Sequence, residues 1–296
     1  MNKSLKIGII SGLIAGFVLA IVNEIFINIR ILLGLYTPFV GSLITNNLVM
    51  NIPLFGFWGI VLGIIYSKVY NVLPRKGILK GLVYGLILYI LVTIRIEFFS
   101  FAYGKYLDAF GHIFAGFFQW MAYGLVLGFL YEFLSSRFYS LEKEVKIETY
   151  DVKSGILPGA IAGFLGGFVV SIFIVIGHVT GYWGITTAGE IISTIDFWVS
   201  QMGSHVFINM FWGSIFGAIF ARVYNLVPYE KIKKGLIYGL VIFLITSFQV
   251  ETWIICWGAS RNLWTLVINE IIITFLALIM FSTFGIVLGL LYKPKK

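Results

Sequence analysis

Two glutamates occupy matching positions in a segment that the chain contains twice. The stretch FWGIVLGIIYSKVYNVLPRKGILKGLVYGLILYILVTIRIE (57–97) aligns with FWGSIFGAIFARVYNLVPYEKIKKGLIYGLVIFLITSFQVE (211–251), and 17 of the 41 positions are identical. Each copy ends in a carboxylate, Glu97 or Glu251, directly after a long apolar run. A carboxylate at such a place can bind a cation or carry a proton if it faces the interior of the protein.

Other ionisable residues lie at a similar depth in the apolar segments. The residues that we select as candidate ligands for a substrate or ion are Glu97, Glu251, Glu24, Arg95 and Glu270. A charge at mid-bilayer costs about 2.5–3.5 kcal/mol on insertion scales, so such residues usually face a bundle interior or a watery cavity. Two interpretations stay open. The side chains line a polar vestibule on the outer side, or they lie near enough to the membrane interface to snorkel or pair locally.

The three histidines are weak candidates for metal ligands. His112, His178 and His205 each lie at the outer end of an apolar segment, where they could join the carboxylates around a metal ion. No two of them have a ligand spacing such as HxxxH, and a histidine at the membrane edge is commonly an interfacial residue. We therefore expect no resident cofactor, and we leave a metal site open as a hypothesis.

Catalytic motifs are absent from the sequence. It contains no HExxH, no GxSxG, no P-loop and no GxGxxG, so zinc proteolysis, serine hydrolysis and nucleotide-driven work have no local signature. Cys256 is the only cysteine, which excludes a disulfide framework within the chain. We expect that the protein is not an enzyme.

The composition places these residues in a membrane. Hydrophobic residues make up 59% of the chain and charged residues 11%, with a mean hydropathy of +0.98, whereas a soluble domain carries about 25% charged residues. We therefore expect an all-α integral membrane protein whose main partner is the lipid bilayer, with no nucleic-acid partner. A run of about 20 apolar residues crosses the hydrocarbon core. The predicted spans are about 7–29, 50–70, 80–100, 112–134, 155–177, 205–225, 235–257 and 266–291.

The lysines and arginines predict the orientation. Of the 21 basic residues, 17 lie at the two termini, in the 71–79 and 226–234 turns, in the 135–154 linker or at the helix ends beside them. Basic residues accumulate on the cytoplasmic side of membrane proteins. We therefore expect a multi-pass protein of the cell membrane with both termini in the cytoplasm.

The duplicated segment predicts two repeats. Repeat 1 covers 1–134, a charged cytoplasmic linker covers 135–154, and repeat 2 covers 155–296. Each repeat has four spans, so both start on the same side of the membrane. The expected architecture is two parallel four-helix repeats related by a pseudo-twofold axis along the membrane normal. Glu24 aligns with Ser171 in the second repeat, so a site that contains Glu24 would be asymmetric.

Every predicted span contains a GxxxG motif. Glycines four residues apart lie on one helix face and allow another backbone to approach closely. We expect these faces to pack helices together, and they also offer a surface for a homo-oligomer or a membrane partner. The pairs are Gly12/Gly16, Gly59/Gly63, Gly81/Gly85, Gly124/Gly128, Gly159/Gly163, Gly213/Gly217, Gly235/Gly239 and Gly285/Gly289.

The functional hypothesis from the sequence is a transporter or permease-like protein for a small solute or ion, with a polar vestibule on the outer side. The repeat and the depth of the charged residues motivate it. The alternative is a non-transporting membrane scaffold, a complex subunit or a lipid-interacting protein.

Overall fold

A computed structural model of the 296-residue chain describes residues 3–32, 45–102, 106–138, 150–179, 188–260 and 262–294. All regular secondary structure in these ranges is helical. The chain divides into two compact units, Met1–Ile147 and Glu148–Lys296, and each is described by itself.

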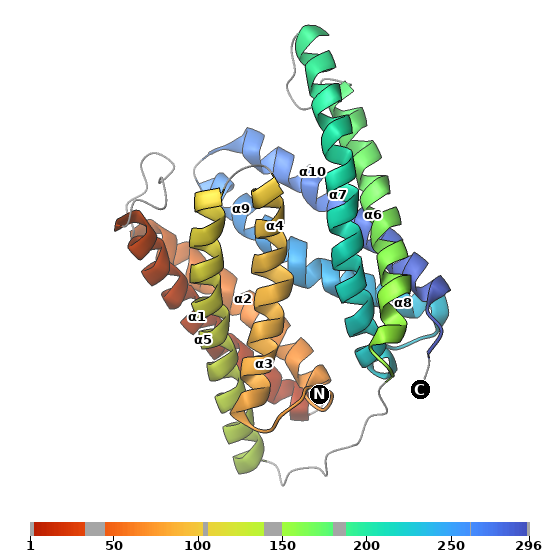
Figure 1. Cartoon of the computed structure of the whole chain (residues 1–296). Coiled ribbons are helices and arrows are strands. Elements are labelled where there is room, and N and C mark those ends of the chain that lie inside the picture. Colours follow the sequence, from red (N-terminus) through yellow and green to blue (C-terminus); the bar gives the residue numbers. More distant parts are fainter. Residues whose placement is uncertain are drawn as a thin grey trace. The chain divides into compact units, whose positions relative to one another are not determined.

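Unit 1 contains four long helical segments within its described residues, and their arrangement can be followed in Figure 1. Three consecutive elements, α3, the π-helix η1 and α4, follow one another without a break and act as a single segment. The elements are α1 (Lys3–Leu32), α2 (Thr45–Val69), α3 (Ile78–Leu88), η1 (Tyr89–Ile94), α4 (Arg95–Ala102) and α5 (Tyr106–Phe138).

Unit 2 also contains four long segments, and its third segment is again interrupted by a π-helix. Its second segment is longer than the predicted span, because α7 begins well before His205. The elements are α6 (Lys153–Val179), α7 (Ala188–Val223), the 3-10 helix η2 (Tyr224–Leu226), α8 (Lys231–Phe243), the π-helix η3 (Leu244–Phe248), α9 (Gln249–Ser260) and α10 (Trp264–Leu291).

Eight helical segments in the described ranges are long and apolar enough to cross a membrane. This finding confirms the prediction of an all-helical chain with eight such segments and indicates a multi-pass membrane protein. The spans run over Lys3–Ile29, Met50–Val69, Ile78–Phe98, Ala109–Arg137, Lys153–Gly177, His205–Leu226, Lys231–Cys256 and Trp264–Leu291.

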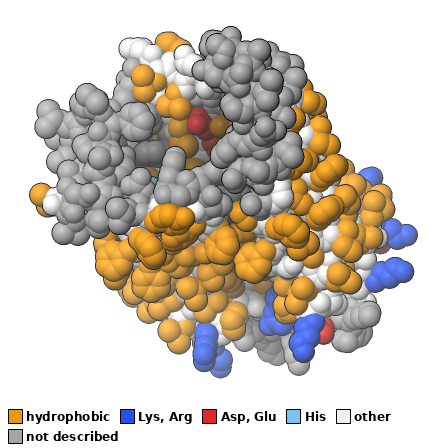
Figure 2. Space-filling model, turned by 45° about the horizontal axis from the view of Figure 1, so that its top comes forward, with side chains coloured by type: hydrophobic (Ala, Val, Ile, Leu, Met, Phe, Trp, Pro, Cys, Tyr) orange, Lys and Arg blue, Asp and Glu red, His pale blue; other side chains and the backbone are white. Residues whose placement is uncertain are grey.

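Helix α1 shows why these segments require lipid. Large apolar side chains recur every three or four residues along one face and are exposed, and Ile10, Ile21 and Ile25 are about half exposed. On the opposite face Ser11 and Ala15 are completely buried. A contiguous apolar surface of this kind is rare in water. In Figure 2 hydrophobic side chains cover much of the described surface in view, and Lys and Arg side chains lie along its margin.

The first two helices of each unit touch along a stripe of glycines, which we call the first seam. In unit 1, a Cβ atom added to Gly12 of α1 would lie 2.8 Å from the Cα of Gly63 in α2. In unit 2, a Cβ atom added to Gly159 of α6 would lie 2.7 Å from the Cα of Gly217 in α7. Both distances are shorter than real Cβ contacts, so larger residues would push the helices apart.

A second seam joins the third and fourth segments of each unit. A Cβ atom on Gly128 of α5 would lie 2.8 Å from the Cα of Gly81 in α3, and one on Gly235 of α8 would lie 2.6 Å from the Cα of Gly289 in α10. The two seams of each unit contain four GxxxG pairs, so the four seams together account for all eight. A contact with another chain through one of these faces would therefore have to displace a helix of the same unit.

Buried lysines lie at the start of α3 and α8. The ammonium group of Lys80 lies 4.0 Å from the ring centroid of Tyr70, and that of Lys234 lies 4.0 Å from the centroid of Tyr224. Lys234 also donates a hydrogen bond of 3.1 Å to the carbonyl of Tyr224, where the helix ends and its carbonyls lack helical partners. The sequence indicated only that these residues add positive charge at the membrane edge. The aromatic rings and the helix end explain their burial.

The seams predict that glycine substitutions will have unequal effects. We expect Gly12→Ala to destabilise the protein by about 1–3 kcal/mol, because the added methyl group overlaps the backbone of α2. The matched control is Gly203→Ala in α7, where an added Cβ meets nothing within 4 Å. Thermal unfolding of the purified protein in detergent measures both, and equal melting temperatures for the two variants would contradict the close contact.

Candidate functional site

The first seam of unit 1 ends in a buried polar pair. Residues four apart on a helix share a face, and Glu24 continues the face of α1 that forms this seam. On α2, Asn51 continues the face that contains Gly59 and Gly63. The side-chain amide of Asn51 donates a hydrogen bond to Glu24 Oε1, and both residues are buried. The residues in this register on α1 are Gly8, Gly12, Gly16, Ala20 and Glu24.

Amide side chains extend this polar level. Asn28 Nδ2 donates to the backbone carbonyl of Glu24 at 2.7 Å, one turn further along α1. Gln119 Nε2 of α5 donates to Asn23 Oδ1 of α1 at 3.1 Å. Polar contacts therefore connect α1 to both α2 and α5 at this level of the bundle.

The second seam of unit 1 ends in an acid–histidine pair. Glu97 Oε1 of α4 lies 3.0 Å from His112 Nδ1 of α5. Closer to the glycines, Trp120 Nε1 donates to Thr93 Oγ1 at 3.0 Å. A Cβ atom on Gly116 would lie 2.6 Å from Thr93 Cγ2, so glycine also permits the close approach of the two helices beside the pair.

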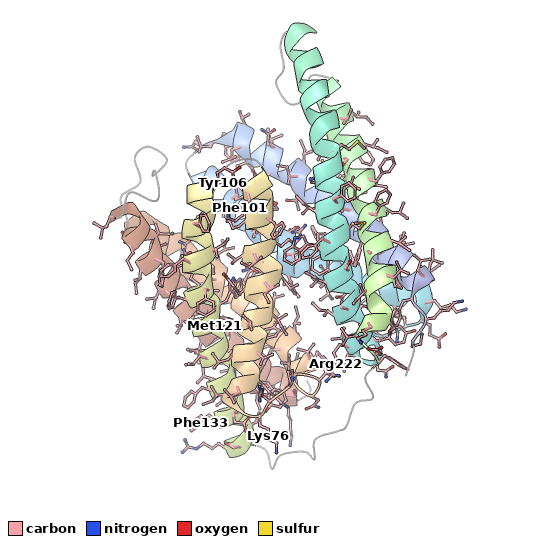
Figure 3. All side chains as sticks on the ribbon, in the orientation of Figure 1. Lys76, Phe101, Tyr106, Met121, Phe133 and Arg222 are labelled. Carbon is pink, nitrogen blue, oxygen red and sulfur yellow. The ribbon has the colours of Figure 1, made fainter. Side chains whose placement is uncertain are left out.

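Figure 3 shows the two ends of unit 1, one of which contains the acid–histidine pair. Phe101 of α4 and Tyr106 of α5 are labelled at one end of the unit, and Lys76 and Phe133 at the other. Glu97 lies one turn before Phe101, so the acid–histidine pair belongs to the end opposite the lysine-bearing turn that precedes α3. The glycines of the seam lie between the two ends.

The two members of the pair differ in their exposure. The Glu97 side chain is 7% exposed and the His112 side chain 43% exposed. Within the part of the chain that the structure describes, Glu97 Oε2 is buried and has no hydrogen-bond partner. Arg95, two residues earlier, is also buried. Buried charges are normally paired and fully hydrogen-bonded, so a carboxylate with one oxygen left bare is an unusual feature.

A π-helix precedes the acidic residue in each unit. η1 ends at Ile94, directly before Arg95, and η3 ends at Phe248, directly before Gln249. Single turns of π-helix are rare and are frequently found at functional sites, because the wider turn reorients the side chains that follow it. No feature of the sequence that we considered predicted these two turns.

Unit 2 lacks the acid–histidine pair in this register. Glu251 aligns with Glu97 and is half-buried, but the residue of α10 that aligns with His112, at the spacing that relates YGLVLGFLY (123–131) to FGIVLGLLY (284–292), is Ile273. Ser171 aligns with Glu24 and donates its hydroxyl to the Gly167 carbonyl at 2.7 Å.

The remaining candidates belong to unit 2. Glu270 is half-buried in α10, where its backbone carbonyl accepts a bond of 2.7 Å from Thr274 Oγ1. The backbone carbonyl of half-buried His205 accepts a bond of 3.0 Å from Asn209 Nδ2. The side chain of His178 lies outside the described residues. Among the residues that are described, no three His, Cys, Asp or Glu side chains lie close enough to hold a metal ion.

The functional interpretation rests on these residues themselves, since comparisons with protein-family models, curated proteins and solved structures give no match. Three of the candidate residues selected from the sequence, Glu24, Arg95 and Glu97, are buried in unit 1. All three could be selected from the sequence because of their positions in the outer parts of the predicted spans. The partners Asn51 and His112 were not recognised as partners, because they lie 27 and 15 positions away along the chain and meet the carboxylates only across a helix pair.

The Glu24–Asn51 bond predicts non-additive stability. We expect Asn51→Leu to destabilise the protein by about 1–3 kcal/mol, because Glu24 then remains buried without its donor. Replacing both residues by leucine should recover much of this loss, since no buried polar group is left unpaired. A double-mutant cycle from reversible unfolding in detergent measures the coupling, and strictly additive effects would show that the bond is unimportant.

Proposed function

We propose that this chain is a transporter or permease-like protein of the cell membrane that moves a small solute or ion. The observation that carries the proposal is the burial of Glu24 and Glu97 at the ends of the two helix seams of unit 1. A carboxylate inside a membrane bundle opposes insertion and folding, so its presence is a reason to infer a binding or transfer role.

The chemistry of the site favours a cation or a proton-coupled step. Glu97 Oε2 has no hydrogen-bond donor in the described residues, and an unbonded carboxylate oxygen is suited to a cation or a proton. Glu24 has a donor in Asn51, which holds its orientation. In this proposal Arg95 contributes to the polar vestibule of unit 1, and Glu251 and Glu270 are the corresponding candidates within unit 2.

We also propose that the two units are parallel repeats related by a pseudo-twofold axis along the membrane normal. The internal identity of 17 in 41 positions supports this. Equivalent contacts support it as well: Tyr84 donates its hydroxyl to the Leu62 carbonyl in unit 1, and Tyr238 donates its hydroxyl to the Phe216 carbonyl in unit 2. Transport would then occur by rocking of the repeats, with each seam moving as a rigid pair.

The proposed orientation, with both termini in the cytoplasm, predicts a labelling pattern. In a background with Cys256→Ala, we expect a membrane-impermeant maleimide to label Asn262→Cys in intact cells, because this position lies in the outer connection between α9 and α10. Lys76→Cys, in the turn before α3, should react only after permeabilisation. The opposite pattern would contradict the orientation.

The transport proposal predicts loss of flux without loss of fold. In proteoliposomes we expect the wild type to move at least one of the probe cations Na⁺, K⁺ and Mg²⁺, measured one at a time with dyes enclosed in the vesicles. Glu97→Gln and Glu24→Gln should each reduce that flux about tenfold or more, because both remove a charge that binds the cation.

The matched control is Glu230→Gln, which removes a carboxylate from an exposed position before α8. We expect its flux to equal that of the wild type, and size-exclusion profiles establish that all variants are folded. Wild-type vesicles that move none of the three cations, or variants at Glu97 and Glu24 that retain full flux, would contradict the proposal and favour the non-transporting scaffold.

A further inference from the structure

We propose that Glu97 and His112 form a proton-exchange site, so that a proton and the transported cation bind the same carboxylate in turn. The inference rests on the proposed function. It adds that the proton is the ion coupled to transport and states the direction in which each ion moves. The protein would exchange one proton for one singly charged cation. The cation and the proton would cross the membrane in opposite directions.

The first argument is the unequal environment of the two carboxylate oxygens. Oε1 of Glu97 lies 3.0 Å from His112 Nδ1, whereas the buried Oε2 has no hydrogen-bond partner within the described ranges. A buried anionic oxygen without a donor is unfavourable, and either a proton or a cation relieves this state by neutralising the charge. Because both ligands neutralise the same carboxylate, binding of one disfavours the other.

The second argument is the position of the histidine. His112 is 43% exposed while its partner carboxylate is buried, so the ring extends from the buried oxygen toward the surface of the unit. Imidazole has two nitrogens and can accept a proton at one while it releases a proton from the other. His112 therefore offers a route by which a proton reaches Glu97 without water entering the helix seam.

The proton step is balanced with these two residues alone. A proton that binds His112 Nε2 makes the ring cationic. The Nδ1–H bond then breaks as an O–H bond forms on Glu97 Oε1, which leaves a neutral ring and a neutral carboxylic acid. The bound cation leaves the carboxylate when it is protonated, and the reverse sequence admits the next cation. No oxidant, reductant or further reactant is required.

Other titratable or charged residues lie on the two helices that carry the pair. Arg95 precedes Glu97 on α4 and is buried. Helix α5, which packs against α4, has three titratable residues at this end, namely His112, the exposed Tyr106, and Asp108, whose side chain is not among the described ones. His112 contacts Glu97 directly, at 3.0 Å between Nδ1 and Oε1.

The alignment of the units restricts the proposed route to unit 1. Glu251 aligns with Glu97, but Ile273 occupies the position on α10 that aligns with His112. An isoleucine cannot accept or release a proton, so the same relay cannot operate at that position of unit 2.

The test measures cation and proton movement in the same vesicles. Proteoliposomes enclose the pH indicator pyranine, and an inward gradient of Na⁺ or K⁺ is applied while radiolabelled cation uptake is followed separately. For the wild type we expect the cation to enter and the interior to become alkaline as protons leave. Glu97→Gln should reduce both signals about tenfold or more.

The decisive variant is His112→Gln. Its amide can still donate a hydrogen bond to Glu97, but it cannot carry a proton between two nitrogens. We expect cation-driven proton movement to fall about tenfold and its profile against external pH to change, while Glu230→Gln behaves as the wild type. Circular dichroism and size-exclusion profiles of each variant establish that the fold is intact.

The outcomes separate the two proposals. If the wild type moves Na⁺ or K⁺ with no proton in exchange, the proton-exchange site is wrong and transport stands. If His112→Gln exchanges protons as fast as the wild type with an unchanged pH profile, the histidine only positions Glu97 and the inference is overturned. If the wild type moves neither cation in this assay nor Mg²⁺ in the preceding one, the proposed function fails together with the inference.

Discussion

Close contact between helix backbones is the constraint on which both units depend. Lipid tails are as apolar as the side chains that they touch, so helices in a membrane associate through packing and hydrogen bonds rather than by escape from water. Glycines four residues apart provide that packing here, and the distances across Gly12 and Gly63 leave no room for a Cβ atom. This geometry sets the distance and the register of each helix pair.

The register of the seams determines where polar side chains meet. Counting in steps of four from Gly12 leads to Glu24, and counting along α5 from Gly128 leads to His112. Each of these residues meets a partner from the facing helix, Asn51 or Glu97. In each helix pair the tightly packed part and the polar end are thus two parts of one interface, and a displacement of either seam would separate the polar pair at its end.

Several features could be predicted from the residues themselves. The eight spans follow from apolar length, and the buried carboxylates follow from their depth, because a charge in lipid has few acceptable positions. The Glu97–His112 contact could not be predicted, since the spacing of two residues on different helices depends on which faces pack. The burial of Lys80 was also missed, because the ring of Tyr70 reaches it only after α2 and α3 have been brought together by the turn.

The sequence by itself determined that the chain is helical and apolar enough to span a membrane, because these properties are sums over local residues. It also determined the internal similarity and the places at which charges interrupt apolar segments. Only the tertiary structure decided that Glu97 has a histidine partner and one oxygen without a partner among the described residues, that Glu24 has an amide donor, and that π-turns precede the acidic residues. These features depend on contacts between helices, whose energies are set by close packing that no linear pattern records.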